Sequence, residues 1–160
     1  MDKILIHTLT IFLFMACTSQ KPSAVNQPVT QGIVGEVIWL EGNQMPGPTP
    51  EGSKTGDSNE KKGIPVEREI HVYKLLNVKD TESKGSFITD VNGHLVKKVY
   101  SNAEGKFSVS LSPGEYSLLV KEGDFFFANL FDGNNNIHPV VVNQNKVTET
   151  TIKVDYKAAY

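Results

Sequence analysis

Short runs of alternating apolar and polar residues dominate the chain from residue 32 onward. Phe107, Val109 and Leu111 alternate with polar residues, and the same period of two continues in 116–121 and 151–156. This period predicts β-strands with one face in a core and the other face in water. No window of about eleven residues repeats apolar positions at helical spacing without an interrupting Gly or Pro. The pattern therefore predicts an all-β domain.

Turn-forming residues separate these runs. Asn102–Gly105 and Ser112–Gly114 are the clearest turns, because Gly adopts positive φ readily and Pro presets a negative φ. We expect 112–114 to join two paired strands, from which Phe107 and Leu118 point into the core. Several short strands at this spacing favour an antiparallel β-sandwich of about seven to nine strands. The expected strands are 33–40, 68–76, 87–89, 94–101, 106–111, 115–121, 139–142 and 147–156.

The first residues have the features of a targeting signal. Lys3 precedes a mostly apolar run over 4–16, which is shorter than the roughly 20 residues of a membrane-spanning helix. The run ends in Phe14-Met15-Ala16-Cys17, which resembles the lipobox of bacterial lipoproteins. That resemblance implies a signal peptide over 1–16, cleavage before Cys17, and acylation of the Cys17 sulfur and of the new amine. The alternative is a plain secretory signal with an incidental Cys.

The segment after the signal is predicted to be a tether. Residues 17–31 hold the lipidated Cys and then small and polar residues without helix or strand periodicity. A flexible chain of this length reaches about 20 Å, so the domain over 32–160 should stay close to the bilayer. Thr18 is not the acidic residue that retains some bacterial lipoproteins at the inner membrane. We therefore expect a location in the bacterial cell envelope, lipid-anchored at the outer membrane.

The segment 43–63 breaks the strand pattern. It is rich in Pro, Gly and charged residues and has almost no apolar side chains, so it buries too little surface for a core element. We predict a long loop between the first two strands. A solvated insertion and a partner-binding loop both fit its composition.

Composition narrows the classes of function. The 160 residues carry 16 Lys and Arg against 18 Asp and Glu, and the net charge of −2 excludes a basic nucleic-acid-binding domain. The single Cys excludes an internal disulfide and a multi-cysteine metal site.

Part of the domain carries a family resemblance. The residues that carry it are 32–37, 63–66, 70–73, 101–107, Pro113-Gly114 and Tyr116. Their strand-and-turn register resembles that of the carboxypeptidase regulatory-like domain. The resemblance implies a transthyretin-like (prealbumin-like) Greek-key antiparallel sandwich, and a non-catalytic accessory or recognition role.

The sequence contains no recognisable catalytic motif. His71, His94 and His138 lack metal-ligand spacing, and we expect surface or hydrogen-bonded structural roles for them, with His71 on the wet face of its strand or at the edge of the sheet. Cys17 is taken by the anchor, and no Gly-x-Ser-x-Gly motif occurs. We therefore predict no enzyme activity, no metal and no cofactor. A hydrolase or metalloenzyme site assembled from distant residues remains the alternative.

An aromatic cluster precedes an Asn-rich segment. If 125–127 is a strand, Phe125 and Phe127 face one way and Phe126 the other. Residues 132–136 predict a tight loop, because Gly and Asn tolerate positive φ, with an unusual oxygen-ligand site as the alternative. The rings either pack in the core and cover an edge, or they form a recognition patch with the neighbouring polar groups. The residues of that patch are Phe126, Asn129, Phe131, Asp132 and Asn134.

The sequence thus predicts a membrane-anchored, non-catalytic lipoprotein that binds or scaffolds a component of the bacterial envelope. Its expected partners are the membrane, through the lipid anchor, and an envelope protein or a glycan, but no nucleic acid. The alternative is a carbohydrate-binding module, because aromatic rings beside amide and carboxylate groups suit the partly apolar faces and polar edges of sugars.

Overall fold

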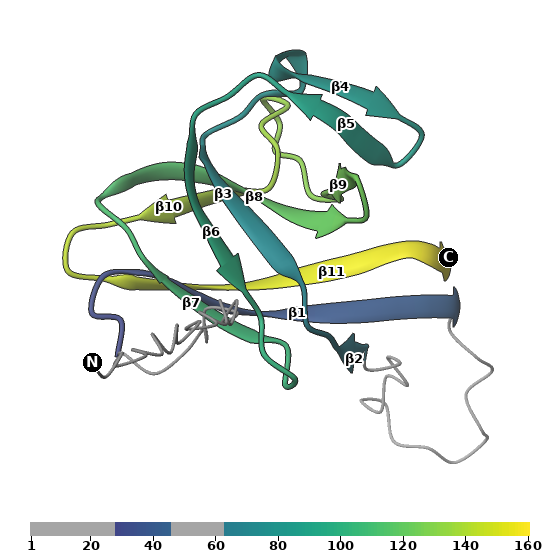
Figure 1. The fold of residues 1–160 in the computed structure, drawn as a ribbon, viewed down its shortest axis with the longest axis horizontal. Helices are drawn as coiled ribbons and strands as arrows, with labels where there is room; N and C mark the ends of the chain where they lie inside the picture. The colour runs from purple at the N-terminus through teal and green to yellow at the C-terminus, as the bar shows by residue number, and fades with distance from the viewer. Residues whose placement is uncertain (1–27, 46–62) are drawn as a thin grey trace, which may run out of the picture.

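The computed structural model describes residues 28–45 and 63–160. Within these ranges the chain forms eleven strands and one short 3-10 turn, η1 (Val78–Asp80). The strands belong to two sheets, which pack against each other as the layers of a sandwich (Figure 1). The prediction of an all-β sandwich is therefore confirmed. Most of the predicted loop at 43–63 lies outside the described residues.

The first sheet is built around β1 (Gly32–Asn43). β11 (Val147–Ala159) runs parallel to β1 along one edge, with Gly32 beside Val147 and Asn43 beside Ala159. On the other edge, β7 (Lys106–Ser110) and β2 (Ile64–Pro65) pair antiparallel with successive parts of β1. The parallel pair departs from the antiparallel pattern expected from the sequence. Parallel neighbours need a long connection, and here almost the whole domain supplies it.

The second sheet has the strand order β4-β5-β9-β8-β3-β6, and all its pairs are antiparallel. β10 and β9 pair with opposite ends of the same edge of β8. The strands of this sheet are β3 (Glu69–Lys74), β4 (Thr81–Lys84), β5 (Phe87–Val91), β6 (Leu95–Tyr100), β8 (Gly114–Glu122), β9 (Phe125–Phe127) and β10 (Pro139–Val142).

The main core lies between the two sheets. Ile33 on β1, Val72 on β3, Phe107 on β7 and Leu118 on β8 are almost fully buried in it. The Phe107 ring lies so close to β1 that a Cβ at Gly35 would come within 2.8 Å of it. A glycine at that position therefore lets the ring fill the space between the sheets.

The connection 112–114 crosses between the sheets, and the expectation that it joins paired strands is wrong. β7 pairs with β1 in the first sheet, whereas β8 pairs with β3, β9 and β10 in the second. Phe107 and Leu118 do point inward as expected, but they do so from facing sheets. A Pro-Gly turn reverses the chain both in a hairpin within one sheet and in a connection between two sheets. The turn residues alone therefore do not determine which strands pair.

The outer face of the second sheet is also covered, although the alternation along 115–121 predicts a wet face there. Ser117 and Leu119 are fully buried on that side of β8. A second, smaller core forms against them from β3, β5 and the segment 128–138, and it comprises Tyr73, Leu76, Ile88, Leu119, Ala128 and Ile137. The chain thus builds a third layer over part of the sandwich.

Candidate functional site

A cleft of about 430 Å³ opens between the tip of the β4–β5 hairpin, β9 and the end of β11. These elements meet at the right-hand end of the molecule in Figure 1. Six residues give the cleft its chemical character: Phe87, Asn129, Phe131, Asp155, Tyr156 and Tyr160. Aromatic rings therefore form much of its wall, and its polar side-chain groups are an amide, a carboxylate, phenols and the hydroxyls of Ser83 and Ser86.

The aromatic walls are packed into the end of the main core. The Tyr156 ring contacts Phe87 and Phe127 edge to face, with ring centroids 4.8 and 5.3 Å apart. Such arrangements bring the positive edge of one ring to the negative face of the next. Phe131 and Tyr160 lie further out and are 47% and 70% exposed. The cleft thus combines a rigid aromatic base with two accessible rings.

Asp155 organises the polar side of the cleft. Its Oδ1 accepts a hydrogen bond from Asn129 Nδ2 at 2.8 Å, and its Oδ2 accepts one from the Tyr160 hydroxyl at 2.6 Å. The bond to the Asp155 carboxylate raises the pKa of Tyr160 to about 12, because ionisation would destroy the donor and place two negative charges together. Both side chains that meet Asp155 are therefore held in one orientation.

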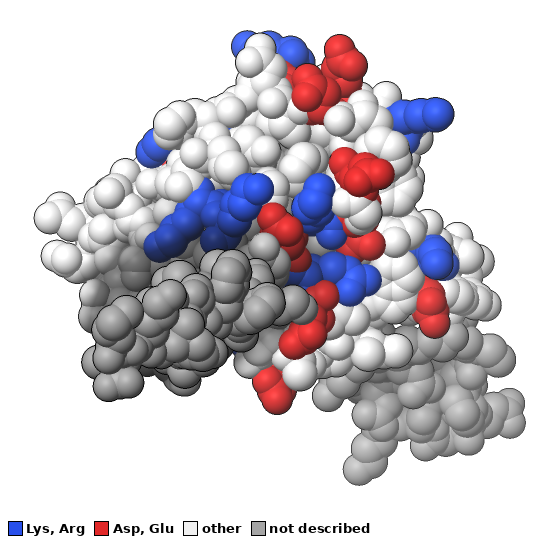
Figure 2. All heavy atoms as spheres, viewed as in Figure 1, with Lys and Arg blue, Asp and Glu red and all other residues white. Residues whose placement is uncertain are grey.

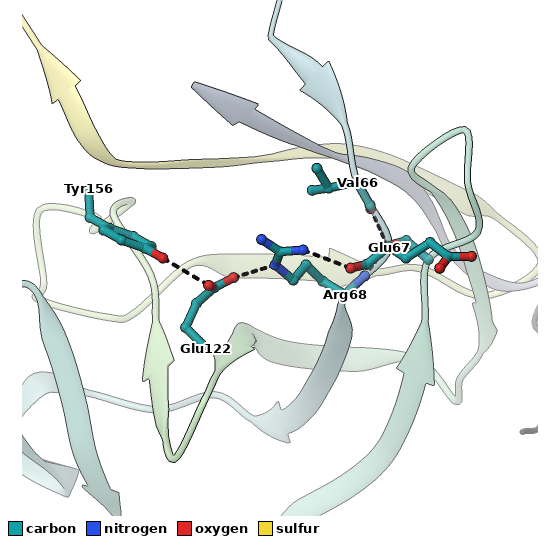
Figure 3. Close-up of polar contacts among 6 residues, drawn as sticks. Val66, Glu67, Arg68, Glu122 and Tyr156 are labelled. Atoms are coloured by element: carbon teal, nitrogen blue, oxygen red, sulfur yellow. Dashed lines mark hydrogen bonds and ion pairs between the residues drawn. The ribbon is translucent and has the colours of Figure 1, made fainter. Parts of the chain in front are cut away.

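A second polar network holds Tyr156 from behind (Figure 3). The Tyr156 hydroxyl donates to Glu122 Oε2 at 3.0 Å, and Arg68 Nε donates to Glu122 Oε1 at 2.5 Å. Burial and the bond to Glu122 both raise the pKa of Tyr156, so the ring stays a neutral donor. The Trp39 ring meets Tyr156 edge to face at 5.0 Å. These contacts tie the end of β11 to both sheets.

The cleft carries little charge. Among the described residues that line it, Asp155 is the only charged one. Figure 2 shows charged side chains of both signs scattered over the face in view.

The structure separates the residues of the predicted recognition patch. Asn129 and Phe131 line the cleft. Phe126 instead faces the outer side of the second sheet, where its ring lies 4.7 Å from that of His71 and packs against the second core. It follows the expected alternation, because Phe127 is buried in the main core. Phe125 is 43% exposed and does not line the cleft.

Asp132 and Asn134 belong to the tight loop that the sequence predicts over 132–136. Asp132 Oδ1 accepts hydrogen bonds from the backbone N–H groups of Asn134 and Asn136, and Asp132 Oδ2 accepts one from Asn136 Nδ2. These donors, Asn136 foremost, hold the pKa of Asp132 below its ordinary value. Asn135 takes the positive φ, at 63°. Asp132 therefore stabilises the loop beside the cleft and is not part of the cleft lining.

The expectation that His71 lies on the wet face or at the sheet edge is wrong, because β3 pairs with β6 and with β8 and His71 is buried. Its side chain is buried under Phe126, and His71 Nε2 lies 2.6 Å from Glu69 Oε1. His138 is likewise buried. In the described ranges, 28–45 and 63–160, no three His, Cys, Asp or Glu side chains come together as metal ligands would.

Sequence reasoning missed Asp155, Tyr156 and Tyr160 as parts of a site. Asp155 and Tyr156 stand in the last strand, and Tyr160 directly follows it, about thirty residues beyond the aromatic run. The pairing of β11 with β1 carries this part of the chain to the cleft. Tyr156 and Tyr160 are four positions apart, an even offset that would place both on one face of an extended strand. That spacing was the one available signal.

The predicted signal peptide over 1–16, the lipidation residue Cys17 and most of the tether lie outside the described residues. In the part that the structure describes, no helix has the length and apolarity needed to cross a bilayer.

Comparisons of this chain with protein-family models, curated proteins and solved structures found no match.

Proposed function

We propose that the chain is a membrane-anchored, non-catalytic lipoprotein of the bacterial cell envelope that presents the cleft as a binding site. The observation that carries the binding role is the preordered set of side chains around Asp155, which fixes Asn129 and Tyr160 at one edge of an aromatic cleft. Side chains already held in place lose little entropy when a ligand binds.

The protonation states of these groups support binding rather than catalysis. A Tyr160 pKa of about 12 leaves its hydroxyl protonated near neutral pH, so it is a poor general base. Asp155 already accepts a hydrogen bond on each oxygen. These groups are arranged to hold hydrogen bonds rather than to move protons.

The same proposal includes the family and the location. The turn residues over 101–107 and Pro113-Gly114, set in an all-β sandwich, support a carboxypeptidase regulatory-like domain of transthyretin-like topology. The lipobox-like stretch ending at Cys17 supports an anchor, and Thr18 supports the outer membrane. Two or more acyl chains anchor stably, because each buried methylene contributes about 0.8 kcal/mol.

Replacing Cys17 tests the anchor. In a bacterial host that processes lipoproteins, the Cys17→Ser variant should leave the membrane fraction without detergent and take up no radiolabelled palmitate. A Ser19→Ala variant is the matched control and should behave as wild type. Membrane retention and labelling that persist in Cys17→Ser would contradict the lipoprotein proposal.

A further inference from the structure

We propose that the cleft recognises neutral pyranose sugars of an envelope or extracellular glycan, with Phe131 and Tyr160 as stacking platforms and Asp155 with Asn129 as the hydrogen-bonding edge. This inference rests on the proposed binding function and names its ligand class.

The size of the cleft suits a small part of a larger molecule. Its volume of about 430 Å³ falls in the range of small-molecule sites in proteins, roughly 300–1,000 Å³. Its open side leaves room for a chain to continue beyond the bound units, because accessible rings such as Phe131 stand at the rim rather than over a closed cavity.

The charge of the cleft argues against anionic ligands. Asp155 is the only charged residue among the described ones that line it, and no cation there offsets it. A phosphate, a nucleotide or an acidic sugar would meet a carboxylate at short range without a basic partner, and like charges repel. An anionic ligand is therefore disfavoured.

The accessible rings of Phe131 and Tyr160 favour a ligand with flat apolar faces. Phe131 and Tyr160 are 47% and 70% exposed, so their rings are accessible to a ligand in the cleft. The face of a pyranose presents several C–H groups that carry partial positive charge. The negative face of an aromatic ring attracts such groups.

The polar edge of the cleft, formed by Asp155 and Asn129, favours a ligand that carries hydroxyl groups. Asp155 and Asn129 lie 2.8 Å apart in one hydrogen bond, so their remaining lone pairs and amide proton are spaced for neighbouring groups on one molecule. Adjacent sugar hydroxyls each donate and accept, and a hydroxyl bonded to a carboxylate forms a strong, charge-assisted contact. Ser83 and Ser86 supply further hydroxyls on the β4–β5 side.

A quaternary ammonium ligand is the main competitor, because aromatic rings and a carboxylate also attract cations. Such ligands need rings that surround the cation. Here Phe87 and Tyr156 pack on each other with centroids 4.8 Å apart, which leaves no space for a cation between them. N-methyl groups would also bury the Asn129 amide without a hydrogen bond, whereas a sugar satisfies it.

The test uses the full chain, purified in detergent with its lipid in place, and neutral hexasaccharides of glucose, xylose, mannose, galactose and N-acetylglucosamine. Binding is measured by calorimetry and by saturation-transfer NMR. We expect at least one hexasaccharide to bind, and Phe131→Ala and Asp155→Asn each to weaken that binding by about tenfold or more.

Phe125→Ala is the matched control, because Phe125 on β9 is 43% exposed, much as Phe131 is, but does not line the cleft. It should change affinity by less than about twofold, and melting curves should show all three variants folded. Equal losses in Phe125→Ala and Phe131→Ala would overturn the assignment of the site. Failure of all five hexasaccharides to bind, or tighter binding of choline, would overturn the ligand class.

The outcome of this test is separable from that of the anchor test. A Cys17→Ser variant that leaves the membrane, together with a lipidated protein that binds no sugar, would remove the glycan inference and keep the lipoprotein. Conversely, the protein could bind sugar while its membrane retention does not depend on Cys17. That result would remove the lipoprotein proposal and keep the glycan inference.

Discussion

At the scale of single residues, His138 stands out because it is buried with an ionisable ring. It is 2% exposed, and neither ring nitrogen has a hydrogen-bond partner among the described residues. Its backbone also takes a positive φ of 38° just before Pro139. Burial lowers the pKa of His138 from 6.5 to about 4, because the charged ring would lose its hydration. His71 shifts in the same direction, again chiefly through burial.

The sign of this shift predicts acid sensitivity. The unfolded chain binds a proton at His138 below about pH 6.5, whereas the folded chain resists it until about pH 4, so stability falls with pH across that window. The full loss from His138 is about 3 kcal/mol. We expect His138→Asn to flatten this part of the stability profile, measured by urea denaturation from about pH 7 to pH 4.

His94→Asn is the control, because His94 is exposed. It should retain the wild-type slope of stability against pH. A wild-type slope in His138→Asn as well would mean that other groups cause the acid sensitivity.

At the scale of strands, β7 illustrates how one element faces two environments. Phe107 on this strand is 2% exposed in the main core, and the next residue, Ser108, points to the other face of the sheet. Replacing Phe107 with Ala should lower the free energy of unfolding by about 3–5 kcal/mol, because the ring fills the space over Gly35.

Ser108→Ala is the matched control and should change that free energy by less than about 0.5 kcal/mol. Chemical denaturation of both variants measures the difference. Comparable small losses in the two variants would mean that the inward and outward faces of β7 are assigned wrongly.

Local patterns predicted the strands better than their partners. The alternation around Phe107 and the turn at Ser112–Gly114 gave strand positions within a few residues, because side-chain period and turn chemistry are local properties. The alternation failed at Leu119, where a distant segment covers the outer face. Which strands pair depends on how much apolar surface the whole fold buries, and a local sequence pattern does not show this.

The candidate site was predictable only in part for the same reason. Asn129 and Phe131 stand beside the aromatic run, so composition pointed to them. Asp132 looked like a ligand-binding carboxylate, but its Oδ1 accepts hydrogen bonds from backbone N–H groups of its own loop. Asp155 reaches Asn129 only in the folded chain, across a separation of 26 residues.

At the scale of the whole molecule, stability should be uneven. β1 and β8 each pair on both edges and lie against the main core. β4 pairs only with β5 among the described strands, and most of its side chains are exposed. We expect β4 amides to exchange hydrogen through local opening, and amides of β1 and β8 to exchange only through global unfolding.

Native-state hydrogen exchange followed by NMR or mass spectrometry measures this ordering. β6 is a useful comparison, because it also forms an edge but pairs with the central strand β3. It should be better protected than β4. Protection of β4 equal to that of β8 would refute the view that the hairpin opens on its own.

The parallel pairing of β1 with β11 has a consequence for how the chain is made. The ribosome synthesises β1 first, and its partner over Val147–Ala159 follows more than a hundred residues later. Until then one edge of β1 offers unpaired backbone groups to any chaperone, protease or neighbouring strand. Contacts so distant in sequence also make folding slow, in the range of milliseconds to seconds. The pairing of β1 with β11 can therefore form only after the last strand has been synthesised.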